Sequence, residues 1–208
     1  MRPHEMGNGR ADAWVERIEE NRRLENLSDP LQEGVRGLFG QGAGATVRSV
    51  LRGEFLGHPL HPALTDLPIG AWTAGLVFDL ASLGGSRELA RAAQASVAVG
   101  VVGAIGAAVT GLADWSETEG KAQRVGVVHA ALNAVGLGLQ IASLAQRRSG
   151  RGSGRLLSAL GCACAFASAY LGGKLVYRLG TGVKVSQRAA YSARGAERYG
   201  ADLPRDFQ

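Results

Sequence analysis

The residue types able to carry chemistry are concentrated in residues 57–72, which read GHPLHPALTDLPIGAW. His58 and His61 each precede a proline, and X-Pro steps disfavour helical geometry at the residue before the proline. Asp66 lies about one turn further along, and His129 is an isolated histidine in a later apolar segment. Imidazole and carboxylate groups bind divalent metals and carry protons. His58, His61, Asp66 and His129 are therefore a candidate metal or proton site.

His61 and His129 are also candidate ligands of a cofactor. One imidazole from each of two facing helices in a four-helix bundle is the arrangement that bis-histidine ligation of a b-type haem requires. Arg124 or Lys174 would then lie near a haem propionate. The cofactor stays open between haem b and a divalent metal.

A third interpretation needs no cofactor, because the same groups can hold a bundle together. The protein is then a structural or partner-binding membrane subunit, and this is the interpretation that we adopt from the sequence. The alternatives are a haem electron-transfer protein and a metal- or proton-binding transporter or sensor. The sequence contains no nucleophile elbow, phosphate loop or H-E-x-x-H motif, so nothing in it indicates an enzyme.

Four apolar segments must position these residues, and each is close to the roughly 20 residues that a bilayer core demands. The second has no charge and no polar face, which excludes an amphipathic helix of a soluble bundle. The sequence predicts an all-α, four-helix transmembrane bundle over residues 56–180, between a polar, amphipathic arm (1–55) and a polar tail (181–208). The predicted spans are residues 60–83, 92–112, 125–145 and 156–173.

Two details of this architecture can be tested. In the arm, residues 11–27 and 31–38 form amphipathic patterns typical of interfacial or cytosolic helices. Residues 28–30 (Ser-Asp-Pro) predict a stop and a new helix start between them. In the first span, Asp79 is expected to pair within the bundle or to lie near the far interface.

Up-down alternation of the spans brings further polar residues to the membrane face that holds the histidines. Asp114, Trp115, Asn133 and Lys174 form the predicted structural polar cluster at this face. Small residues recur every four positions in the spans, which favours close helix packing.

A weak internal repeat relates the first two spans to the last two. His61-Pro-Ala-Leu-Thr is similar to His129-Ala-Ala-Leu-Asn, and Asp79-Leu-Ala-Ser-Leu is similar to Gln140-Ile-Ala-Ser-Leu. A parallel repeat has its axis along the membrane normal. It would place His61 opposite His129.

The histidine–proline run, residues 111–115, His129 and residues 170–173 together resemble a family of bacterial predicted membrane proteins, domain-of-unknown-function family 2231. The resemblance covers roughly residues 50–185 and implies membrane location. Some relatives carry a Rieske iron–sulfur domain on the same chain, which implies a redox partner such as a Rieske protein. This sequence has no C-x-H…C-x-x-H ligand set, so no cluster of its own is expected.

The net charge of +5 is distributed in short basic clusters between the apolar segments, as expected beside lipid headgroups. Aromatic–basic interleaving is missing, which argues against a nucleic-acid partner and leaves the lipid bilayer and a possible second copy. No signal peptide is expected. Eight basic residues flank the spans on the side of the termini and six on the other side, which predicts cytoplasmic termini in the inner (cytoplasmic) membrane.

Overall fold

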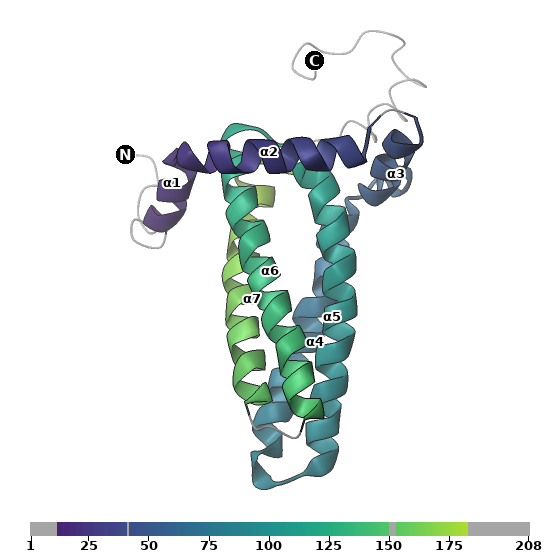
Figure 1. The fold of residues 1–208 in the computed structure, drawn as a ribbon, viewed down its shortest axis with the longest axis vertical. Helices are drawn as coiled ribbons and strands as arrows, with labels where there is room; N and C mark the ends of the chain where they lie inside the picture. The colour runs from purple at the N-terminus through teal and green to yellow at the C-terminus, as the bar shows by residue number, and fades with distance from the viewer. Residues whose placement is uncertain (1–11, 41, 150–152, 183–208) are drawn as a thin grey trace, which may run out of the picture.

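The computed structural model describes residues 12–40, 42–149 and 153–182, and every regular element in these ranges is helical. Four long helices lie side by side in one elongated bundle (Figure 1): α4 (Leu60–Ala81), α5 (Arg87–Trp115), α6 (Gly120–Arg148) and α7 (Gly154–Tyr177). All four are long and apolar enough to cross a membrane. The predicted four-span helical bundle is therefore confirmed. α5, α6 and α7 extend past the predicted spans because their polar and charged ends continue the helix beyond the apolar segment, whereas α4 ends at Ala81, two residues before its predicted end.

The bundle consists of two tightly packed hairpins, α4–α5 and α6–α7, which contact each other less extensively. Glycines allow the close approach inside each hairpin. A Cβ atom at Gly100 would lie 2.2 Å from Nε1 of Trp72, and one at Gly161 would lie 3.0 Å from Nε2 of Gln140. The close helix packing that the spacing of the small residues predicts is thus present. The short 3-10 helix η2 (Ser82–Gly84) follows α4.

The hairpins repeat the same internal contacts. In the first, Nδ1 of His61 lies 2.8 Å from the carbonyl oxygen of Ala107. In the second, Nδ1 of His129 lies 2.8 Å from the carbonyl oxygen of Ser168. The two histidines are 68 positions apart and the two carbonyls 61 positions apart. A shift of 68 positions therefore relates α4 to α6, and a shift of 61 positions relates α5 to α7.

The same two shifts relate a second pair of contacts in the middle of the bundle. Trp72 donates its indole N–H to the carbonyl of Val97 (3.3 Å), and Gln140 donates its amide N–H to the carbonyl of Ser158 (3.2 Å). Gln140 is thus the counterpart of Trp72. The predicted match of Asp79 with Gln140 is wrong, because it rests on a run of small and aliphatic residues that occurs at more than one register.

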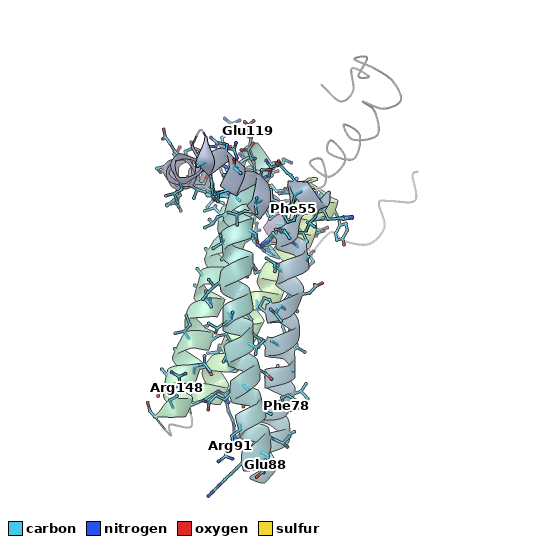
Figure 2. The ribbon with its side chains drawn as sticks, turned by 90° about the vertical axis from the view of Figure 1, so that its right-hand side faces the viewer. Phe55, Phe78, Glu88, Arg91, Glu119 and Arg148 are labelled. Atoms are coloured by element: carbon cyan, nitrogen blue, oxygen red, sulfur yellow. The ribbon has the colours of Figure 1, made fainter. Side chains whose placement is uncertain are left out.

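A buried ion pair joins the hairpins at the end of the bundle away from the histidines. Arg147 binds both carboxylate oxygens of Asp79, with Nη1 2.7 Å from Oδ1 and Nη2 in contact with Oδ2. Arg155 lies 3.8 Å from the same carboxylate. The expectation that Asp79 is paired within the bundle is confirmed. Figure 2 shows Arg148 at this end and Glu119 at the opposite one.

The N-terminal arm comprises α1 (Ala13–Glu20), α2 (Arg23–Leu38), α3 (Ala43–Leu51) and the 3-10 helix η1 (Glu54–Leu56). α2 lies across the end of the bundle, nearly perpendicular to the spans (Figure 1). The predicted stop at residues 28–30 is wrong, because α2 continues through Pro30 and the break falls at Asn21 instead. Pro30 and Asn26 are both exposed. The Asn26 carbonyl that Pro30 leaves without a helical partner can therefore bond to water.

Candidate functional site

The two histidines meet between the hairpins. The ring centroids of His61 and His129 are 6.2 Å apart and their planes are nearly perpendicular, at 86°. The internal repeat predicts this opposition, since the histidines occupy equivalent positions of α4 and α6. We call these two residues the histidine pair.

Hydrogen bonds fix the tautomer of both rings. Each Nδ1 faces a backbone carbonyl of its own hairpin, Ala107 for His61 and Ser168 for His129. A carbonyl can only accept, so each Nδ1 carries the proton and each Nε2 of the neutral rings is an acceptor. This is the arrangement of a metal-ligating histidine, whose second nitrogen donates to a carbonyl or carboxylate.

The two members of the pair differ in their remaining contacts. The side-chain amide nitrogen of Asn133 lies 3.0 Å from Nε2 of His129, and the Ser168 hydroxyl lies 2.9 Å from its Nδ1. Within the described part of the chain, Nε2 of His61 has no hydrogen-bond partner. His129 is therefore held on both nitrogens, whereas His61 presents one that is unoccupied.

Equivalent glycines allow both rings to lie against the neighbouring helix. A Cβ atom at Gly111 would lie 2.8 Å from Cε1 of His61, and one at Gly172 would lie 3.2 Å from Cε1 of His129. A larger residue at Gly111 would force the His61 ring to move, and one at Gly172 would require the His129 ring to shift by a few tenths of an ångström. Both glycines belong to the segments that carry the family resemblance, so these segments shape the histidine pair.

The structure does not bring the other two candidate metal ligands to this pair. His58 and Asp66 are both exposed, and Asp66 is five residues from His61, which places it on a different face of α4. Among the described residues, no three His, Cys, Asp or Glu side chains are grouped closely enough to hold a metal ion.

The residues of the predicted polar cluster share one end of the bundle, but each has its own partner. Asn133 binds His129, as described above. The remaining contacts are Asp114 with Nε of Arg52 (3.7 Å), the Trp115 indole N–H with the carbonyl of Gln123 (3.1 Å), and Lys174 with Asp12 (2.7 Å). They fasten helix ends and the arm rather than forming one site.

Sequence reasoning missed the docking of the arm onto this end. Arg124 donates to the backbone carbonyl of Glu19 (2.7 Å) and pairs with the carboxylate of Glu25. Lys174 binds Asp12, and this hydrogen bond lowers the pKa of the Asp12 carboxyl. The two basic residues expected near a propionate are thus neutralised by the arm. The sequence gives one sign of this docking: Glu19 lies four positions after Val15, on the apolar side of α1.

The fold and the site define a class of protein: a four-span helical membrane protein in which two imidazoles face each other between a pair of hairpins. The chain belongs to the family described as predicted membrane protein (DUF2231), whose model matches residues 57–185, more than half of its length. The match begins at the glycine of the histidine–proline run. No curated protein and no solved structure matches the chain.

Proposed function

We propose that His61 and His129 would hold a b-type haem and that the protein transfers electrons in the membrane. The observation that carries this proposal is the separation of the two rings, 6.2 Å between centroids. A metal bound on opposite sides by ring nitrogens about 2 Å away would hold two imidazole centroids roughly 6 Å apart. The separation therefore suits one metal between the rings.

The residues around the pair support this role. The carbonyls of Ala107 and Ser168 orient the rings and keep the proton on Nδ1, which leaves Nε2 as the ligating atom. Asn133 would have to release Nε2 of His129 before it could bind a metal. His61 and His129 would hold the group between the two hairpins, which contact each other less extensively than the helices within each hairpin do. When bound, the haem supplies one-electron redox chemistry.

Absorbance spectra test the proposal directly. The full chain is expressed in a haem-replete host, purified in mild detergent and measured oxidised and dithionite-reduced. We expect a Soret band and a reduced α-band at about 560 nm, as bis-histidine b-type haem gives. His61→Ala and His129→Ala should abolish both bands. His58→Ala is the matched control, because this exposed histidine lies in the same histidine–proline run and outside the pair.

Two results would count against haem. A colourless preparation that also fails to bind added haemin would exclude it. A colourless protein with stoichiometric metal, lost in His61→Ala and kept in His58→Ala, would favour the metal- or proton-binding transporter or sensor instead. Elemental analysis of the same samples makes this distinction.

A structural or partner-binding membrane subunit is the second candidate, and one observation favours it. Both nitrogens of His129 are already hydrogen-bonded, to Ser168 and Asn133, so this residue can serve the fold without any ligand. In that case His129→Ala weakens the packing of α6 against α7 while the spectra and metal content of the wild type stay blank. Thermal unfolding in detergent measures this loss.

The location and partner of the protein are part of the proposal. The basic residues on the side of the termini support an inner-membrane protein with cytoplasmic termini, which alkaline phosphatase and green fluorescent protein fusions to each loop would test. The family resemblance supports a redox partner such as a Rieske protein. Reoxidation of the dithionite-reduced protein by a purified Rieske domain would measure that transfer.

A further inference from the structure

Helix α2 of the arm has three distinct sides. Its inward side is polar: Ser28 is fully buried, and Gln32 donates to the carbonyls of Trp115 and Thr118, both at 2.8 Å. A second side carries three leucines that are largely exposed, Leu27 (58%), Leu31 (53%) and Leu38 (78%). The third side, roughly opposite the leucines because successive residues lie about 100° apart, carries the exposed residue Glu33 and, in line with it, the exposed N-cap residue Arg22. Asp29 accepts a hydrogen bond from Gln123 of the bundle (2.6 Å) and so belongs to the polar inward side.

This pattern is the reverse of a helix that docks on a soluble protein. Such a helix buries its apolar side and exposes its polar side. In α2 the buried residues that bind the bundle are polar, and among residues 12–40, 42–149 and 153–182 nothing covers the three leucines. A row of exposed leucines on one side of a helix indicates a surface that contacts an apolar environment.

We propose that the leucine side of α2 lies in the headgroup–acyl boundary of the same bilayer that α4–α7 cross. Three sides then meet three surroundings: the bundle end, the acyl chains and the aqueous phase. Interfacial helices have this geometry, with the axis in the membrane plane and apolar side chains buried a few ångströms below the headgroups. The arm is a lipid-contacting surface rather than a cytosolic extension.

The position of α2 favours the bilayer, and not a soluble partner, as the surface that covers its leucines. The helix lies nearly perpendicular to the spans, beside their ends (Figure 1), near the level at which the apolar core of a bilayer ends. The apolar exposure continues along the arm into α3 and η1, where Figure 2 shows Phe55 at the same end of the bundle. The further exposed residues are Val47, Val50, Phe55 and Leu56. Arg23 at the start of α2 suits anionic headgroups.

Spin-label accessibility tests the proposal in the full chain. Cys162 and Cys164 are replaced by alanine, a single cysteine is placed at Leu31 or at Glu33, and each variant is labelled with a nitroxide. The proteins are reconstituted in vesicles of phosphatidylcholine and phosphatidylglycerol. Collisions with molecular oxygen, which partitions into lipid, are compared with collisions with a water-soluble nickel chelate. Glu33 is the matched control, because it lies on the charged side of the same helix.

We expect oxygen to dominate at position 31 and the nickel chelate to dominate at position 33. Dominance of the nickel chelate at both positions would place the leucines in water and overturn the proposal. Protection of position 31 from both reagents, with dipolar broadening between labels, would place a second copy over the leucines and overturn it equally.

Photolabelling of the unmodified protein covers the case in which a labelled variant does not fold. Vesicles that contain a phospholipid with a diazirine near the top of its acyl chain are irradiated, and the labelled peptides are mapped by mass spectrometry. Adducts in residues 27–38 at a level comparable with adducts at the span ends support the proposal. Adducts confined to the spans refute it.

Discussion

The buried ion pair between Asp79 and Arg147 offers the sharpest test of how the two hairpins are held together. The side chains of Arg147 and Asp79 are only 8% and 5% exposed, so water screens their interaction little. Asp79→Ala removes the carboxylate and leaves the Arg147 guanidinium buried without a counter-charge. Breaking one side of such a pair costs about 3–5 kcal/mol, because the remaining charge stays desolvated.

The double variant Asp79→Leu with Arg147→Met separates this penalty from the net value of the pair. Replacing both charges by apolar residues of similar volume is commonly neutral or stabilising by about 1–4 kcal/mol. The double variant should therefore be more stable than Asp79→Ala alone. Arg155, the third charge in the cluster, is partly exposed and can turn towards solvent.

Unfolding in mixed micelles of dodecyl maltoside and SDS, followed by circular dichroism, measures these differences. Arg148→Ala is the control: this exposed arginine is adjacent to Arg147 in the chain, and its loss should change stability by less than about 0.5 kcal/mol. The reasoning fails if Asp79→Ala costs no more than Arg148→Ala. It also fails if the double variant is less stable than Asp79→Ala.

Two further results are expected. Gly100→Ala would put a Cβ atom 2.2 Å from the Trp72 indole nitrogen, so it should lower stability by about 1–3 kcal/mol. Gly106→Ala, where a Cβ atom meets nothing within 4 Å, should leave stability unchanged. If both variants lose the same stability in the SDS titration, the close packing of Gly100 against Trp72 is contradicted. The bond from Lys174 lowers the pKa of Asp12, so docking of the arm should be complete above the ordinary carboxyl pKa of 3.8 and weaken only as the pH falls through the lowered value. Limited proteolysis by pepsin across this range should cleave the arm at lower pH in the wild type than in Asp12→Asn.

The spans were predictable because the bilayer imposes a length and an absence of charge that are visible in the sequence alone. The second span, residues 92–112, shows both without exception. The opposition of His61 and His129 was predictable from the repeat, since identical residues stood at matching positions of like helices. Alignments of the two halves of the repeat are less reliable where they rest on small residues, and for this reason the sequence pattern pairs Gln140 with Asp79 instead of Trp72.

The arm was not predictable in the same way. Its contacts join residues far apart in the chain, such as Glu25 with Arg124 and Asp12 with Lys174, and no local pattern indicates which acid meets which base. The proline at position 30 predicts a helix end from local preference, but its exposure lets α2 continue. Local signals fail here because docking on the bundle end, rather than intrinsic helix preference, decides where α1 and α2 break.

The two hairpins differ at a position where two identical hairpins would place like charges against each other. Asp79 and Arg147 are 68 positions apart, the same shift that relates His61 to His129, so both pairs occupy equivalent positions of α4 and α6. Two identical hairpins related by the same axis would oppose two aspartates or two arginines, and like charges in a buried site repel. The opposite charges at this position therefore require two non-identical hairpins. The histidines are identical across the same axis, but their surroundings are not, because Asn133 binds Nε2 of His129 alone.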